Sequence, residues 1–216
     1  MAKYVINDGV CVLSSRKKSI VNNAFMDCTE LKSIVIPDSV TKIGENAFSG
    51  CTGLTSITIP DSVTEIGCSA FEKSGLTSIT IPNGVTDIHE RAFQDCKALT
   101  SVVIPESVTD LKNSLFSGCS ALKEVRLPDT MTTIRLWVFD GCTSLETIKI
   151  PESIEYFGLG YMSNIPRMMK GDPFRGCSAL KSISMPQKAF DAIEKRAIFE
   201  PGRAMDEETQ KLIVII

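Results

Sequence analysis

The sequence has 216 residues, of which 43% are hydrophobic and 23% charged, with a formal net charge of -3. This apolar content is enough for a buried core and excludes an intrinsically disordered chain. The balance of 23 Lys and Arg against 26 Asp and Glu excludes a strongly basic nucleic-acid binder, and no apolar stretch approaches the roughly 18 residues of a membrane-spanning helix. We therefore expect no nucleic-acid partner and no membrane insertion.

The first 19 residues are expected to form an N-terminal cap. Residues 3–13 predict a pair of strands around Asn7-Asp8-Gly9, because Asp-Gly is a strong turn signal in hairpins. The residues after Met1 show neither the long apolar run nor the cleavage pattern of a signal peptide. The sequence as given favours the cytoplasm, and a protein from which an export signal had been removed would be on the cell surface or secreted.

Residues 20–186 repeat with a period of 22 or 23 residues. One unit, residues 51–73, reads CTGLTSITIPDSVTEIGCSAFEK. Phenylalanine and proline mark the same period, at Phe25, Phe48, Phe71, Phe93, Phe116 and Phe139 and at Pro37, Pro60, Pro82, Pro105, Pro128 and Pro151. A period of this length predicts a solenoid, in which one coil cannot bury its apolar face alone and stacks on its neighbours.

Each coil is predicted to contain two short extended segments and one turn. Residues 54–59 end in alternating apolar and polar positions and therefore predict a strand, which Pro60 ends because proline has no N–H to donate. Stacking of the coils would align these strands into a parallel sheet. Residues 63–66 predict a second extended segment, and residues 67–71 are too few for a stable helix and predict a single turn.

The repeated motif L-x-x-I-x-I-P-x-S-V-T-x-I-G-x-x-A-F-x-x-C resembles the BspA-like, treponemal-type leucine-rich repeat over residues 20–186, in about seven coils. The resemblance implies the α/β leucine-rich-repeat class, mostly β, with a right-handed solenoid. The parallel sheet would form its concave face, with short extended and single-turn segments opposite. For exported members, the resemblance also implies surface proteins of bacteria and protists that attach to host matrix proteins or to other cells.

Six of the eight cysteines occupy one position of the repeat: Cys28, Cys51, Cys96, Cys119, Cys142 and Cys177. A disulfide framework fits this column poorly, because parallel Cβ vectors about 4.8 Å apart exceed the usual disulfide separation. Zinc fits it poorly as well, because ligands in a line do not converge on a tetrahedral centre. We therefore expect small buried thiols at a tight corner, with no metal and no cofactor.

No catalytic residue is predicted. The single histidine, His89, takes the position that Gly44 and Gly67 hold in other coils, which favours a solvated turn residue over a general base. The Ser and Thr residues recur at repeat positions, and the glycines belong to the repeat's own turns. We therefore predict that the protein is not an enzyme.

The outward positions of the strands change along the chain. In early coils they are mostly hydroxyl side chains, such as Thr55, Ser56 and Thr58, and in later coils they are charged. Departures from the default residue can encode specificity without loss of stacking, and neutral drift of surface positions is the alternative. The candidate partner contacts from this region are Lys123, Glu124, Arg126, Glu146, Lys149 and Lys181.

An insertion interrupts the period at residues 159–172, where Phe139 and Phe174 are 35 residues apart. In the coil before it, Leu136 and Trp137 replace polar residues of other coils, and Trp137 is expected to point outward. Either the insert folds over them as a local core, or its side chains form an adaptable contact patch for a partner. The candidate contacts here are Trp137, Tyr161, Met162, Arg167 and Met168.

Residues 187–216 are predicted to form a C-terminal cap. Residues 187–199 have the apolar spacing of an amphipathic helix. Residues 212–216 are all apolar, so we expect a strand that packs on this cap or pairs two copies of the chain.

Two functions remain as hypotheses from the sequence. The first is a non-enzymatic protein-interaction module that uses the concave sheet and the 158–174 insert. The second is a cell-surface or secreted adhesin for a host matrix glycoprotein or carbohydrate. A purely structural rod would bind no partner saturably.

Overall fold

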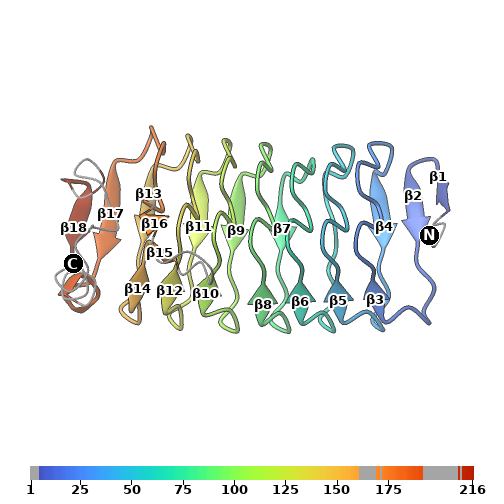
Figure 1. Ribbon diagram of the computed structural model, residues 1–216, viewed down its shortest axis with the longest axis horizontal. Helices are drawn as coiled ribbons and strands as arrows, with labels where there is room; N and C mark the ends of the chain where they lie inside the picture. The colour runs from blue at the N-terminus through green and yellow to red at the C-terminus, as the bar shows by residue number, and fades with distance from the viewer. Residues whose placement is uncertain (1–4, 161–168, 171, 192–208, 210) are drawn as a thin grey trace.

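The computed structural model describes residues 5–160, 169–170, 172–191, 209 and 211–216 (Figure 1). Within this part, the chain winds into a solenoid, and its N-terminal and C-terminal ends lie on opposite sides of the molecule (Figure 1). The predicted mostly-β solenoid is therefore confirmed. The division into a cap at 1–19, a solenoid at 20–186 and a cap at 187–216 remains a proposal.

The first strand of each coil contributes to one parallel surface, which we call the concave sheet. Its strands are β2 (Val10–Val12), β4 (Ser33–Val35), β7 (Ile79–Thr80), β9 (Ser101–Val103), β11 (Glu124–Arg126), β13 (Thr147–Lys149), β17 (Ser182–Met185) and β18 (Ile213–Ile215). The hydrogen-bonded groups along it are β1-β2-β4, in which β1 is Ile6–Asn7, β7-β9-β11 and β13-β17-β18. Between β4 and β7, the coil at residues 55–58 adds an isolated bridge from Thr58 to Thr80. In most strands the middle residue points inward and its neighbours point outward.

A second column of two-residue strands runs along another side of the solenoid. Its strands are β3 (Ser19–Ile20), β5 (Lys42–Ile43), β6 (Glu65–Ile66), β8 (Asp87–Ile88), β10 (Asp110–Leu111), β12 (Thr133–Ile134) and β14 (Tyr156–Phe157). Each strand pairs in parallel with its neighbour within two groups, β3-β5-β6-β8 and β10-β12-β14. The second residue of every strand is buried, as the repeat pattern predicts.

The predicted turns form a third side of the solenoid, where hydrogen bonds also join successive coils. Alternate N–H groups donate to the next coil, as Phe48 N does to the Ala70 carbonyl at 2.7 Å and Gly50 N does to Glu72 at 2.7 Å. In most coils, two residues adopt a positive φ, which allows these hydrogen bonds between coils. In the coil of Phe48 they are Asn46, at 52°, and Gly50, at 72°. Gly tolerates this left-handed region best, which explains why it recurs at the second of these positions, as Gly50, Gly118, Gly141 and Gly176.

The core is a column of phenylalanine rings. From Phe25 to Phe139 and on to Phe174, successive rings are 5.2–5.9 Å apart between centroids and within 9° of parallel. Because each ring contacts the rings above and below it, a coil is stabilised chiefly by its neighbours.

The cysteine column lies beside the phenylalanine column, and all eight cysteines are free. Cys119 Sγ donates to the Phe93 carbonyl of the preceding coil at 3.1 Å, and Cys142 donates to Phe116 at 3.2 Å. Ser74 occupies the same position in its coil and contacts Cys96 Sγ at 3.3 Å. From Cys51 to Cys177, the column therefore consists of buried, hydrogen-bonded small side chains, as expected, whereas Cys28 is half-buried.

The N-terminal end is closed by a hairpin. β1 (Ile6–Asn7) pairs antiparallel with β2, and Asp8 and Gly9 form the turn with φ of 50° and 85°. β2 also pairs in parallel with β4, so the hairpin extends the concave sheet.

At the C-terminal end, residues 187–191 are helical, and the rest of the helix predicted at 187–199 lies outside the described residues. The terminal strand β18 pairs in parallel with β17, the last strand of the repeat, within the same chain.

Within the insertion, β15 (Leu159–Gly160) pairs antiparallel with β16 (Met169–Lys170). The hydrogen bonds between coils resume at Pro173, whose carbonyl accepts from Phe139 N at 2.8 Å.

Candidate interaction surface

Six charged side chains lie exposed on β11, β13 and β17 or directly before these strands. We call them the charged patch: Lys123, Glu124, Arg126, Glu146, Lys149 and Lys181. β13 and β17 pair in register, with Lys149 opposite Ser184, and β11 is in contact with β13. The structure therefore places together all six residues that the sequence predicted for this sheet.

Within the charged patch, Glu146 lies between two lysines. Lys181 Nζ is 2.6 Å from Glu146 Oε2, with side chains 70% and 60% exposed. The hydrogen bond from Lys181 lowers the pKa of Glu146, and the charges of Lys181 and Lys123 add to this effect. Because the pair is exposed, it adds little to stability.

Of the remaining predicted contacts, the structure describes Trp137 alone. Tyr161, Met162, Arg167 and Met168 lie outside the described residues. Trp137 is half-buried in the turn side of its coil, with φ of 56°.

The structure places the side chains of Leu136 and Trp137 differently. Leu136 is 1% exposed although it lies outside the central core cluster, and Trp137 is half-buried. Trp137 also holds the left-handed position that Asn46 holds in its coil, which is a strained backbone for a bulky side chain. Repeat position alone did not reveal this burial.

The N-terminal end of the concave sheet carries an aliphatic row that sequence reasoning missed. Val12 pairs with Val35, and the antiparallel register places Val5 next to Val12. Their side chains are 69%, 55% and 70% exposed, respectively. The signal in the sequence is the alternation of Val10 and Val12 with Cys11, whose side chain points inward. The later strands of the concave sheet alternate in the same way, so this pattern indicates that the first strand belongs to the same sheet.

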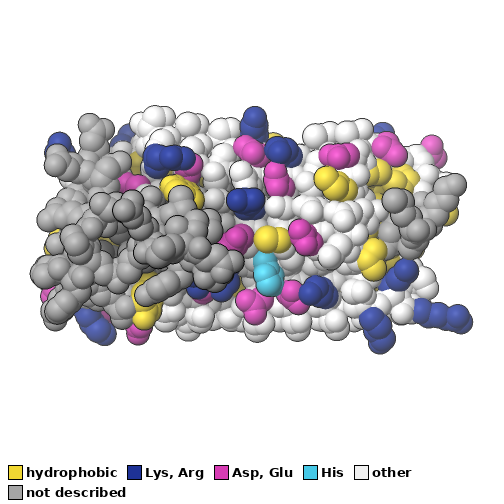
Figure 2. Space-filling view, in the orientation of Figure 1, with side chains coloured by type: hydrophobic (Ala, Val, Ile, Leu, Met, Phe, Trp, Pro, Cys, Tyr) yellow, Lys and Arg dark blue, Asp and Glu magenta, His cyan; other side chains and the backbone are white. Residues whose placement is uncertain are grey.

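The second strand column carries ion pairs of its own. Glu65 Oε1 lies 2.8 Å from Lys42 Nζ and 3.0 Å from His89 Nε2, and the hydrogen bond from Lys42 is the main cause of its lowered pKa. Arg135 NH2 lies 2.7 Å from Asp110 Oδ2. Figure 2 shows acidic and basic side chains interleaved around the single histidine. His89 is therefore a partly exposed residue beside Glu65, consistent with the predicted turn histidine.

The hydroxyl side chains of the repeat hold neighbouring coils together. Ser62 Oγ donates to the Val40 carbonyl at 2.7 Å, and Ser107 donates to Val85 at 2.5 Å. Thr64 and Thr100 likewise donate to carbonyls of the preceding coil. This structural role explains why Ser and Thr recur so regularly.

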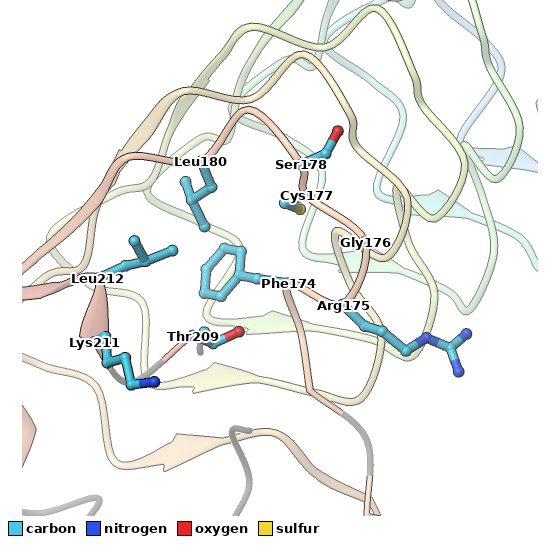
Figure 3. Close-up of a pocket in the computed structure, with 9 residues that line it drawn as sticks. All are labelled: Phe174, Arg175, Gly176, Cys177, Ser178, Leu180, Thr209, Lys211 and Leu212. Atoms are coloured by element: carbon cyan, nitrogen blue, oxygen red, sulfur yellow. The ribbon is translucent and has the colours of Figure 1, made fainter. Parts of the chain in front are cut away.

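Two open depressions lie toward the C-terminal end. In the first, of about 430 Å³, Phe174, Leu180 and Leu212 point toward one another, and Arg175 points away (Figure 3). The second, of about 600 Å³, is lined by Lys149, Glu152, Lys188 and Ile216 among others, at the ends of the patch strands. The second depression borders the charged patch.

Neither a metal centre nor a membrane span emerges from the described part of the chain. No group of three or more His, Cys, Asp or Glu side chains within it could hold a metal ion. None of its helices is long and apolar enough to cross a bilayer.

The chain belongs to the BspA-type leucine-rich repeat family. The family's model, described as a BspA type leucine rich repeat region in six copies, matches residues 18–122, 64–170 and 88–200. This repeat family suggests a role in protein interaction or at a surface, and its members are typically non-enzymatic scaffolds. Comparison with curated proteins finds no match.

Among solved structures, the chain is similar to a leucine-rich repeat protein of Bacteroides ovatus, with 27% identity and a TM-score of 0.55. The match covers 96% of this chain and 60% of that one, so the chain spans 60% of that relative's length. The chain is also similar to the T. pallidum leucine-rich repeat protein, with 22% identity, a TM-score of 0.53 and coverage of 94% and 95%. The second likeness concerns the fold alone.

Proposed function

We propose that the protein is a non-enzymatic interaction module that binds a protein partner through the charged patch of the concave sheet and the 158–174 insert. The observation that carries this proposal is the grouping of six exposed charged side chains on adjacent strands β11, β13 and β17. At the corresponding positions, earlier coils carry mostly Ser, Thr and Val, so the patch is a local departure from the repeat.

The patch is separate from the residues that hold the solenoid together. The inward residues of its strands, Val125, Ile148 and Ile183, are at most 7% exposed and belong to the core. The outward residues can therefore change without loss of core packing, which is how a solenoid presents a binding surface.

The test is partner capture by two versions of the protein. In the reverted variant, the six patch residues carry the default residues of the repeat: Lys123→Thr, Glu124→Ser, Arg126→Thr, Glu146→Thr, Lys149→Thr and Lys181→Thr. We expect a partner recovered with the wild type to bind the reverted variant at least tenfold more weakly, at an unchanged melting temperature. Equal affinity of the two proteins would contradict the proposal.

The insert is tested separately. Because Gly160 pairs with Met169, residues 161–168 can be replaced by Asn-Gly, which closes a two-residue hairpin. Weaker partner binding by a stably folded variant would support the insert's contribution, and unchanged binding would exclude the insert from the binding surface.

Trp137→Ala distinguishes two roles of Trp137. If Trp137 contacts the partner, the variant binds the partner more weakly; if Trp137 is covered by the insert as part of a local core, the variant has a lower melting temperature.

The adhesin alternative predicts binding to immobilised matrix glycoproteins or carbohydrates. The partner test separates the two functions, because an adhesin would bind these ligands saturably in the absence of any other protein. We retain it as the second candidate because the repeat family includes surface roles.

A further inference from the structure

Cations in the second strand column meet carboxylates, but three cations of the charged patch do not. Lys42 binds Glu65 at 2.8 Å and Arg135 binds Asp110 at 2.7 Å. Lys123, Arg126 and Lys149 have no ion pair within the described part of the chain, although all three are exposed on or directly before the strands of the concave sheet. These three side chains are therefore available to an external anion.

The placement of Arg126 and Lys149 also works against stability. They occupy the same outward position on consecutive coils, and like charges on neighbouring strands destabilise a sheet. Thr58 and Thr80 fill this position in earlier coils without such repulsion. Local departures that lower stability mark functional sites in otherwise regular folds.

The surrounding charges leave the patch with a positive excess. It contains four cations and two carboxylates, in a chain whose net charge is -3. One carboxylate, Glu146, is bound by Lys181 at 2.6 Å, which leaves Glu124 as the other. Beyond the strand ends, Glu152 lies 3.3 Å from Lys188, and Asp129 lies at the same repeat position one coil earlier. An acidic ligand is therefore favoured over the strands and disfavoured beyond Asp129.

We propose that Lys123, Arg126 and Lys149 bind an extended acidic segment of the protein partner. This inference rests on the proposed function and names the chemistry of its partner. Alternate side chains of an extended peptide lie on one side, about 6.8 Å apart, and adjacent rungs of the sheet are about 4.8 Å apart. Flexible Lys side chains cover that difference, and the Arg guanidinium matches a carboxylate with two parallel hydrogen bonds.

The probe is a fluorescein-labelled peptide of four Glu-Ser repeats, titrated with protein at low salt and followed by fluorescence anisotropy. The test variant is Lys123→Thr/Arg126→Thr/Lys149→Thr, which installs residues that earlier coils carry at these positions. The control variant Lys32→Thr removes a cation from the same repeat position as Lys123, outside the patch.

We expect saturable binding by the wild type and by Lys32→Thr, at least tenfold weaker binding by the triple variant, and weakening with added salt. A matched Gln-Ser peptide should not bind. Absence of saturable binding to the Glu-Ser peptide, equal binding of the Gln-Ser peptide, or an unchanged affinity of the triple variant would overturn the inference. Far-ultraviolet circular dichroism confirms that the variants are folded.

The two proposals fail in different ways. If the reverted variant loses the partner but the wild type does not bind the Glu-Ser peptide, the interaction surface stands and its acidic ligand is wrong. If the peptide binds through the three cations but the reverted variant keeps its partner, the acidic site stands and the proposed function is wrong.

Discussion

At the residue scale, the cysteine column gives a second hydrogen bond to a backbone carbonyl that accepts only one from its own turn. The Phe93 carbonyl accepts the Cys96 N–H of its own coil at 3.3 Å and the Cys119 thiol of the next coil at 3.1 Å. A carbonyl oxygen has two lone pairs, and both are used here. Cysteine suits this repeat position because its side chain is small enough for the tight turn and still carries a hydrogen-bond donor.

The role of this thiol predicts different effects for two substitutions. Cys119→Ala removes the donor and should lower the free energy of unfolding by about 1–2 kcal/mol. Cys119→Ser keeps a donor, as Ser74 does in its coil, and should cost less. Denaturant unfolding measures both, and a serine variant as unstable as the alanine variant would show that the thiol acts through volume alone.

The thiols also predict a loss of stability at high pH. Burial raises the pKa of Cys96 to about 11 and the pKa values of Cys51 and Cys177 to about 12. In the unfolded chain, these thiols titrate near pH 8.5. The folded state therefore keeps its full stability below that pH and loses stability as the pH rises toward 11–12, because the unfolded thiols release their protons before the buried ones do. Each thiol then lowers the free energy of unfolding by about 1.4 kcal/mol per pH unit.

The measurement is the melting temperature at pH 7, 9 and 10. We expect a steep fall above pH 9 for the wild type and a shallower fall for Cys51→Ser/Cys96→Ser/Cys177→Ser. Parallel curves for the two proteins would contradict the thiol explanation.

At the element scale, the phenylalanine column makes the middle of the solenoid depend on both of its neighbours. Phe93 stacks on Phe71 at 5.4 Å and on Phe116 at 5.5 Å, and its side chain is fully buried. The packing of this ring therefore depends on the coil before it and on the coil after it.

Phe93→Ala should lower the free energy of unfolding by about 4 kcal/mol, because it removes a fully buried ring and leaves a cavity between two others. Phe93→Leu should cost less, because an aliphatic side chain fills part of that cavity. Chemical denaturation compares the two variants, and equal losses would mean that filling the space between the neighbouring rings does not stabilise the coils.

The terminal strand β18 predicts an effect on self-association. It lies at the edge of the described sheet, and Val214 and Ile215 are 48% and 41% exposed. We propose that this edge pairs two copies of the chain, because an unprotected apolar edge strand is a template for pairing. Val214→Lys should then yield a monomer from a wild-type dimer in analytical ultracentrifugation.

The deletion of residues 211–216 is the companion experiment. It exposes β17, whose Ile183 and Met185 are fully buried, and should lower solubility or change the oligomeric state. A wild-type protein that is already monomeric, or a truncated protein that remains a soluble monomer, would contradict this role of β18.

Most of the fold follows from the repeat, because the same residues recur at the same offsets. Phe, Cys and Pro positions predict the stacked columns, and the alternation in each coil predicts both strand columns. The burial of Leu136 could not be predicted this way, because polar residues fill its position in other coils and its surroundings depend on tertiary structure. The aliphatic row of Val12 and Val35 was missed because the first strand was interpreted as a separate cap. The six charged-patch residues were identified from their departure from the default, but their ion pairing required side-chain positions.

At the scale of the whole molecule, the solenoid separates stability from recognition. Inward residues, turn hydrogen bonds and repeated hydroxyls hold the coils together along the entire described stack. Outward residues of the concave sheet take little part in this, so one stretch of coils can carry charges while the others keep hydroxyl side chains. The central claim is that this charged stretch is the surface that meets a partner.

Carbodiimide cross-linking of the complex, followed by mass spectrometry, tests this claim most directly, because the reagent joins lysines to carboxylates in contact with them. We predict cross-links from partner carboxylates to Lys123, Lys149 and Lys181. Cross-links concentrated instead on Lys73 and Lys97, which are exposed outside the concave sheet, would contradict the account.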